Sequence, residues 1–321
     1  MRSERTDSAA QRMRALRCMG ETELVDSAAI LICYDGSPAA RRAIGAASAL
    51  LGARRAVVLD IGPPLTPAES VAVVAPVSPA GAFENVNLDD ARTRADAGAE
   101  LARRAGFAAE ARAGIAAPVW QGIVEAADEI DAAGIVMGTR ALTGARELFE
   151  GSVSHQVAEH AKRPVLIVPP AKAPVDGGPV LICYDGSADA RHAIPVAAAL
   201  LVTRGAVVLD IGPLGLVAEG YAAAGSEAVE LERSVFEETV EQAEAGAQLA
   251  RAVGFTAEAR GTLDSPTWRA VAETADEVGA AAIVLGSRGL TGLRELVEGS
   301  LSHEVAQHGH RPVLVVPPGT A

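Results

Sequence analysis

The feature that most limits how this chain can fold is a repeat of about 150 residues. Leu31–Ser37 (Leu-Ile-Cys-Tyr-Asp-Gly-Ser) recurs unchanged 150 residues later, and so does Ala56–Pro63. Toward the end of each copy, Arg163 and Arg311 begin the same Arg-Pro-Val-Leu segment, now 148 residues apart. Solenoid repeats have periods of roughly 20–50 residues, so we predict a duplicated domain rather than a solenoid.

The repeat divides the chain into four parts. Residues 28–170 form the first predicted domain and residues 180–321 the second, joined by a linker at residues 171–179 that is rich in Ala, Pro and Gly. Residues 1–27 are an Arg-containing polar tail, predicted to be disordered. Because the tail has no apolar segment, it does not have the pattern of a signal peptide.

Within each copy, apolar strands alternate with helical stretches, which predicts a parallel sheet with crossover helices. In the first copy, the predicted strands cover residues 29–34, 56–61, 108–113, 134–137 and 164–168, and the predicted helices cover residues 38–51, 89–105, 118–130 and 152–161. We expect acidic residues to start the second helix at Asp89 and Gly106 to end it, ahead of the third strand. Thr66–Ala82 and Leu216–Ser226 lack any period, so we interpret them as lids that gain order when a ligand binds.

The final strand of each copy, Pro164–Val168 and Pro312–Val316, is short, apolar and predicted to lie at a sheet edge. Bare apolar edges promote aggregation unless they are covered. We therefore predict that these two strands pair antiparallel within one chain, as a pseudo-dimer. The sequence leaves open whether whole chains form homodimers and which proteins they contact.

A glycine-rich loop, Gly286–Ser300, follows a predicted buried strand and precedes a predicted helix. Open α/β sheets bind ligands at the carboxyl ends of their strands, where this loop would lie. Its glycines allow backbone N–H groups to approach an anion, the following helix N-terminus favours negative charge, and Ser300 is the expected N-cap. The loop therefore favours phosphate binding, with a surface loop that only caps its helix as the alternative.

Composition excludes several classes of function. A net charge of −13 argues against general nucleic-acid binding and against an anionic membrane surface, and no apolar run approaches the length of a membrane-spanning helix. Three cysteines form no disulfide framework, which indicates the cytoplasm, and Cys33 and Cys183 are predicted to be inert core residues. The motifs of P-loop, dinucleotide-binding and serine-hydrolase enzymes are absent from the sequence.

The motifs together resemble the universal stress protein family in its tandem form, over both repeats. The resemblance is carried by Asp-Gly-Ser after the first strand, the Gly-x2-Gly-x9-Gly-Ser loop and the terminal Arg-Pro-Val-Leu strand. It implies α/β architecture with two tandem Rossmann-like (adenine nucleotide alpha hydrolase-like) domains, each a five-stranded parallel sheet flanked by helices. It also implies ATP as the ligand, with Mg as an optional companion ion.

The resemblance further implies which residues line each site. In the second domain these are Asp185 and Ile211 at the adenosine half and Gly286, Arg288, Gly289, Gly299, Ser300 and Leu301 at the triphosphate. Their equivalents in the first domain are Asp35, Ile61, Gly138, Arg140, Ala141, Gly151, Ser152 and Val153. For the two aspartates, an Asx turn that starts the next helix is the alternative role. The sequence predicts no catalytic residue and no metal ligand.

Two positions depart from the family pattern. Ala141 replaces the second glycine of the loop, so we expect the second domain, with Gly289, to bind ATP more tightly. Asp60 and Asp210 lie where the family often has His, which predicts an acidic pocket rim.

The sequence thus favours a cytosolic, nucleotide-dependent stress-response regulator that is not an enzyme. One alternative is a pseudo-dimeric scaffold that acts through protein contacts without nucleotide. The other is a slow ATPase.

Overall fold

The computed structural model describes residues 28–64, 82–139, 152–170, 177–213, 226–287, 301–308 and 310–319. Its N-terminal half comprises β1 (Ile30–Cys33), α2 (Pro38–Leu51), β2 (Arg55–Gly62), α4 (Ala82–Arg104), β3 (Ala108–Ile115), α5 (Val119–Glu129), β4 (Gly134–Gly138), α6 (Val153–His160) and β5 (Val165–Val168). The C-terminal half repeats this order with β6 (Val180–Cys183), α7 (Ala188–Leu200), β7 (Gly205–Pro213), α9 (Ser226–Ala252), β8 (Thr256–Asp264), α10 (Thr267–Glu277), β9 (Ala282–Gly286), α11 (Leu301–His308) and β10 (Val313–Val316).

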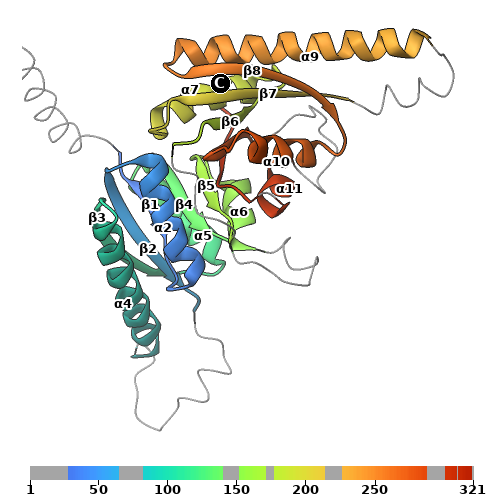
Figure 1. Ribbon diagram of the computed structural model, residues 1–321. Helices are drawn as coiled ribbons and strands as arrows, with labels where there is room; N and C mark the ends of the chain where they lie inside the picture. The colour runs from blue at the N-terminus through green and yellow to red at the C-terminus, as the bar shows by residue number, and fades with distance from the viewer. Residues whose placement is uncertain are drawn as a thin grey trace, which may run out of the picture.

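The strands form one continuous sheet in the order β3-β2-β1-β4-β5-β10-β9-β6-β7-β8 (Figure 1). Within each half the five strands are parallel, as the alternation of strands and helices predicts. At the centre, β5 and β10 pair antiparallel, and Leu166 lies opposite Leu314. The predicted pairing of the two edge strands within one chain is confirmed.

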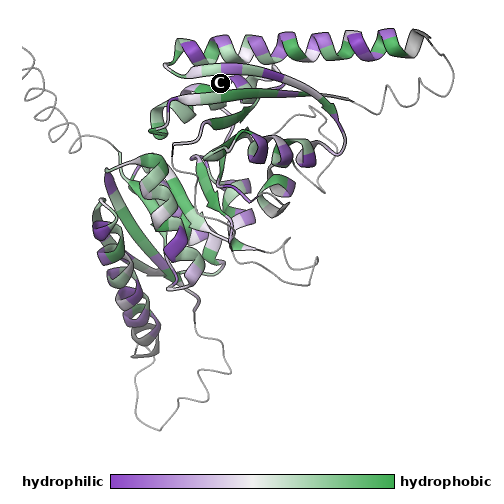
Figure 2. Cartoon of the chain, viewed as in Figure 1, coloured by the Kyte–Doolittle hydropathy of each residue, from purple (hydrophilic) through white to green (hydrophobic). Residues whose placement is uncertain are grey.

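Helices cover both faces of the sheet and create two aliphatic cores. One core packs against α2, α4, α7 and α9, and the other packs against α5, α6, α10 and α11. Neighbouring residues of a strand point to opposite faces, so Ile32 enters the first core and Leu31 the second. The inner strands, such as β1 and β4, are therefore apolar throughout, while the outermost strands β3 and β8 also contain charged residues, which Figure 2 shows as purple segments on β8.

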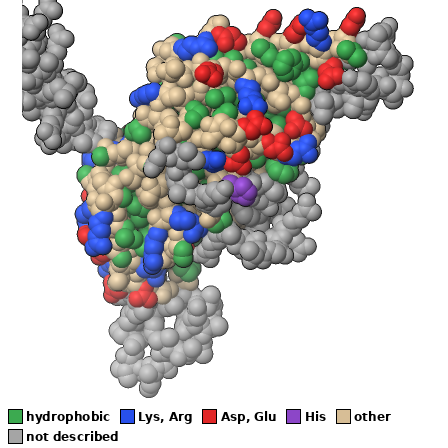
Figure 3. All heavy atoms as spheres, viewed as in Figure 1, with side chains coloured by type: hydrophobic (Ala, Val, Ile, Leu, Met, Phe, Trp, Pro, Cys, Tyr) green, Lys and Arg blue, Asp and Glu red, His purple; other side chains and the backbone are tan. Residues whose placement is uncertain are grey.

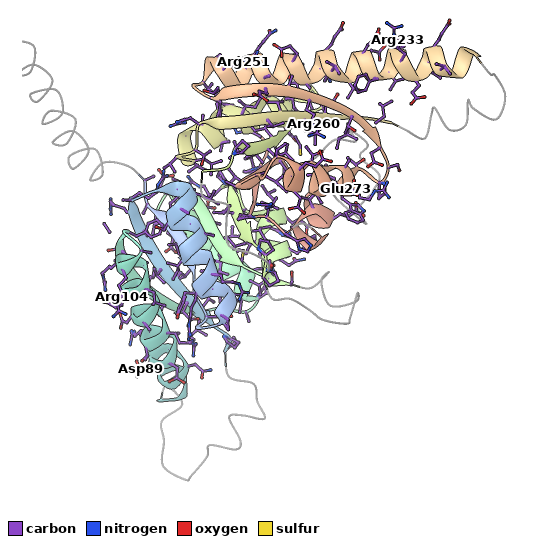
Figure 4. All side chains as sticks on the ribbon, in the orientation of Figure 1. Asp89, Arg104, Arg233, Arg251, Arg260 and Glu273 are labelled. Atoms are coloured by element: carbon purple, nitrogen blue, oxygen red, sulfur yellow. The ribbon has the colours of Figure 1, made fainter. Side chains whose placement is uncertain are left out.

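The helices at the two ends of the sheet are α4 and α9. Each of these helices has a glycine that lies directly against a tyrosine ring. A Cβ on Gly98 of α4 would be 2.6 Å from Cδ1 of Tyr34, and a Cβ on Gly246 of α9 would be 2.7 Å from Cδ1 of Tyr184. Each helix therefore packs closely against the tyrosine beneath it. Charged side chains such as Asp89, Arg104, Arg233 and Arg251 lie along these helices (Figure 4).

The predicted start of α4 is wrong. The helix begins at Ala82 instead of Asp89. Neither Gly nor Pro interrupts the chain between Ala82 and Gly98, so the helix extends toward the N-terminus beyond the acidic residues at Asp89. It ends, as predicted, just before Gly106, which has a φ of +100°. The predicted lids lie outside the described residues except for Ala82 and Ser226, the first residues of α4 and α9.

A second contact joins the halves where α2 and α7 end. The backbone N–H of Val202 donates to the carbonyl of Leu50 at 2.9 Å. The guanidinium of Arg54 donates to the carbonyls of Leu51 and Leu200, also at 2.9 Å, so one cation satisfies the carboxyl ends of two helices. Among the described helices, none combines the length and apolar composition needed to cross a bilayer.

Replacing Leu166 or Leu314 by Ala is expected to lower the free energy of unfolding by about 2–4 kcal/mol, because each is 1% exposed at the junction of the halves. The double variant should deviate from additivity, since the two residues lie directly opposite each other. Urea unfolding measures both effects. Leu249→Ala, at a residue 40% exposed on α9, is the control, and equal losses in all three single variants would contradict the prediction.

Candidate functional site

A cavity of about 640 Å³ lies at the carboxyl ends of β1, β2 and β4 in the N-terminal half. Its size is within the range of small-ligand pockets, and its position is where open α/β sheets bind ligands. The first turns of α2 and α6 border it through Ala40 and Val153. Two helix N-termini therefore face the cavity, and both favour an anion there.

The structure brings five of the eight residues predicted for this site into the lining of one cavity. They are Asp35, Ile61, Gly138, Ser152 and Val153. The other three, Arg140, Ala141 and Gly151, lie outside the described residues. Ligand contact by these residues remains a prediction.

Asp35 forms the Asx turn considered for it and also lines the cavity, while its contact with a ligand stays a prediction. One carboxylate oxygen, Oδ1, accepts the backbone N–H of Ser37 at 3.0 Å, and the Ser37 hydroxyl in turn accepts the N–H of Ala40 at 3.2 Å. The Asx turn and the N-cap of α2 thus form in succession. Since Asp35 also lines the cavity, the turn fixes its carboxylate at the cavity wall.

Gly138 and Ser152 shape the opposite side of the cavity. A Cβ on Gly138 would lie 2.4 Å from the carbonyl oxygen of Ala39, so only glycine lets the end of β4 approach the first turn of α2. The Ser152 hydroxyl accepts the N–H of His155 at 3.2 Å and caps α6, the role predicted for its equivalent, Ser300.

In this half the predicted acidic residue, Asp60, lines the cavity, but an arginine offsets its charge. Asp60 is only 4% exposed, and its Oδ2 accepts a hydrogen bond from Nε of Arg94 on α4. Burial raises the pKa of Asp60, while the hydrogen bond and charge of Arg94 oppose that rise. Arg94 also lines the cavity and was not predicted, because its position in the sequence is that of an ordinary charged residue on an amphipathic helix.

The strand cysteines differ from the prediction in one respect. Cys183 is buried, but Cys33 is partly exposed and lines the cavity. Burial, with the nearby charges of Asp35 and Asp60, raises the pKa of the Cys33 thiol to about 12, and burial also raises the pKa of Cys183. Both thiols therefore stay protonated, which agrees with the predicted inertness.

In the C-terminal half, a cleft of about 700 Å³ lies between the end of β7 and α9. Asp185 and Ile211, both predicted site residues, line it. Gly286 ends β9 and Leu301 begins α11, and neither belongs to this lining. The other four predicted residues, Arg288, Gly289, Gly299 and Ser300, lie outside the described residues.

The charge of this second cleft differs from that of the first. Among the described lining residues, four are acidic and none is basic: Asp185, Asp210, Glu238 and Glu241. Burial, reinforced by the charge of Asp185, raises the pKa of Asp210 to about 6, although the backbone N–H of Ile211 donates to it at 2.9 Å. The predicted acidic rim is therefore present in this half. The described residues contain no cluster of three metal-ligating side chains.

The molecule is thus a tandem Rossmann-like α/β protein with a ligand-sized hollow where the parallel strands of each half end. The model of the universal stress protein family matches residues 28–169 and 178–317, and the chain belongs to this family.

Individual relatives agree with this assignment. Universal stress protein YxiE of Bacillus subtilis (strain 168) is 52% identical over 42 residues, a stretch covering 13% of this chain and 28% of that protein. The crystal structure of a universal stress protein from Archaeoglobus fulgidus DSM 4304 has a TM-score of 0.63 at 20% identity, covering 91% of this chain and 96% of its own. A functionally unknown protein from Pseudomonas aeruginosa PAO1 has a TM-score of 0.52 at 15% identity, covering 92% and 94%. Both structures share the fold.

Replacing Asp210 by Asn is expected to stabilise the protein at pH 7.5 by on the order of 1 kcal/mol, after allowance for solvent screening. The pKa of Asp210 in the folded state, about 6, is above the ordinary 3.8, so the folded protein favours the protonated carboxyl. The free energy of unfolding therefore falls as pH rises from the ordinary pKa through the folded-state pKa. The gain should therefore shrink at pH 4.5. Thermal unfolding across this pH range measures it.

Asp264→Asn is the control. Arg269 lowers the pKa of Asp264, so the effect of this substitution on stability should have the opposite sign to that of Asp210→Asn. That variant should lose stability at neutral pH, and its difference from the wild type should vanish as pH falls through the lowered pKa. A pH-independent effect of Asp210→Asn would contradict the prediction.

Proposed function

We propose that this protein binds adenine nucleotides, ATP foremost, and acts as a nucleotide-dependent regulator of the stress response. The observation that carries the proposal is the cavity of the N-terminal half. There, residues from three strand ends and two helix N-termini, distant in sequence, converge on one space large enough for a nucleotide. In the C-terminal half, the Gly-x2-Gly-x9-Gly-Ser pattern from Gly286 to Ser300 supports the same ligand.

The cavity suits binding better than catalysis. The Cys33 thiol stays protonated because its pKa is raised, and Asp60 is tied to Arg94, so neither is available as a nucleophile or base. We therefore propose a binding module in which nucleotide occupancy is the signal, with Mg accompanying the phosphates. Free cysteines in the described strands support a reducing compartment, the cytosol.

The surface supports small-molecule and protein partners. On the face shown in Figure 3, basic side chains are interspersed with acidic ones, so nucleic acid is not among the proposed ligands. A scaffold that acts through protein contacts is the second candidate. It is favoured by apolar side chains exposed along α9, where Val229 is 56% and Phe236 44% exposed.

Replacing Ser152 by Ala is expected to weaken ATP binding in the N-terminal half by about tenfold, because a hydroxyl beside the phosphates and the N-cap of α6 are lost together. Binding of adenosine, which lacks phosphate, should stay unchanged. Calorimetric titration of the full chain with both ligands measures the two affinities. Ser48→Ala, which removes a hydroxyl bonded to the Ala105 carbonyl away from the cavity, is the control.

The nucleotide content of the purified protein after denaturation tests the proposal directly. Adenine nucleotide in the released fraction is the expected result. A protein that carries none and shows no heat of binding with ATP would overturn nucleotide binding and leave the scaffold as the remaining candidate.

A further inference from the structure

The two halves differ in charge at one position of the helix that borders each site. Arg94 of α4 and Gln242 of α9 are 148 residues apart, the same offset that relates Gly98 to Gly246. Those glycines make the same close contact, with Tyr34 and Tyr184 respectively. The two helices therefore lie equivalently on the sheet, and Arg94 and Gln242 occupy matching places above the ends of the first two strands of each half.

In the N-terminal half, the arginine compensates a buried carboxylate. Nε of Arg94 donates to Oδ2 of Asp60, and both residues line the cavity together with Asp35. The Arg94 side chain stays 39% exposed while its Nε pairs with Asp60, so this cation is accessible from the cavity that it lines. A nucleotide anion entering this cavity meets a carboxylate whose charge is already offset.

In the C-terminal half, the neutral amide leaves the equivalent carboxylate uncompensated. Nε2 of Gln242 donates to the backbone carbonyl of Asp185 at 2.7 Å and contributes no charge. Asp210 of β7 is 9% exposed and shares the cleft with Asp185, which follows β6, and with Glu238 and Glu241 of α9.

Arg191, the arginine on α7, is not part of the C-terminal cleft. Arg191 donates to the Tyr184 hydroxyl at 3.4 Å and is not among the lining residues. On β8, the residue paired with Asp210 is Gly261, which carries no charge. Among the described residues, no element packed around Asp210 therefore supplies a positive charge to the cleft.

We propose that the residue at this helix position decides which charge state of the site accepts a nucleotide. The C-terminal half, with Gln242, binds its nucleotide together with a proton on Asp210. The N-terminal half, with Arg94, binds its nucleotide without taking up a proton on Asp60. The inference rests on the proposed function and assigns it a regulatory asymmetry. The ligand class is the same in both halves, an adenine nucleotide anion.

The direction of the pH dependence follows from the charges. In the free protein the pKa of Asp210 is about 6, and a bound anion raises it further by repelling the deprotonated form. Affinity in the C-terminal half is then highest below pH 6. It falls as pH rises toward the pKa of the bound state, by up to about tenfold per pH unit. This opposes the advantage expected from Gly289 over Ala141, so that advantage shrinks as pH rises.

The experiment is titration of the full chain with ATP between pH 5.5 and 8.0. Hydrogen exchange of the β1–α2 and β6–α7 peptides assigns each binding event to a half. From pH 5.5 to 7.5 we expect affinity to fall about tenfold or more in the C-terminal half and less than about threefold in the N-terminal half. Because the phosphates of ATP titrate alike for both halves, the N-terminal half is an internal reference.

Exchanging the two residues should exchange the behaviour. Gln242→Arg and, separately, Asp210→Asn should flatten the pH dependence of the C-terminal half. Arg94→Gln should impose it on the N-terminal half, and adding Asp60→Asn to that variant should remove it again. Thermal unfolding verifies that each variant is folded, and the double variant keeps the test valid if Arg94→Gln alone is unstable.

The outcomes separate this inference from the proposed function. Absence of adenine nucleotide binding in both halves at every pH overturns the proposed function. ATP binding with the same pH dependence in both halves, or binding confined to the N-terminal half at every pH, overturns only the proton coupling. A pH dependence that persists unchanged in Asp210→Asn likewise overturns the assignment to Asp210.

Discussion

The backbone hydrogen bonds between β5 and β10 are the interaction on which the rest of the structure depends. Without them, each half would be a five-stranded sheet with a short, apolar, unpaired edge, which favours association with other chains. Pairing Leu166 against Leu314 satisfies both edges at once and makes each core continuous across the junction. Arg54 strengthens the same junction by binding carbonyls from α2 and α7. The duplication thus replaces a contact between chains by one within the chain.

Joining the halves at their last strands leaves the carboxyl ends of the other strands accessible. The hollows form at β1, β2 and β4 in one half and at β6 and β7 in the other, on the far sides of the central pair. Each hollow is built by its own half, since the described lining residues of one belong only to that half. The two sites can therefore differ in chemistry without disturbing the junction that holds the sheet together.

The fold was predictable because the repeat and the uninterrupted apolar strands leave few arrangements, and the bare edges of Pro164–Val168 and Pro312–Val316 require a partner. Asp35, Ile61 and Gly138 were placed correctly at strand ends because those ends converge in any parallel sheet. Arg94 was not predicted, because a charged residue on an amphipathic helix is usually solvated. Its contact with Asp60 becomes apparent only when α4 is packed on the sheet. The start of α4 at Ala82 was missed because helix boundaries depend on packing as well as on capping residues.

The comparison of the halves shows which positions the fold holds fixed. Gly98 and Gly246 cannot vary without displacing a helix from its tyrosine, because a Cβ would overlap the ring. Arg94 and Gln242 differ in charge, yet the helices around them lie alike, so this position is free of such packing constraint. A change there leaves the backbone in place and alters the electrostatic cost of the carboxylate beneath it. Duplication thereby allows one half to change its response to pH while the other retains a compensated pocket.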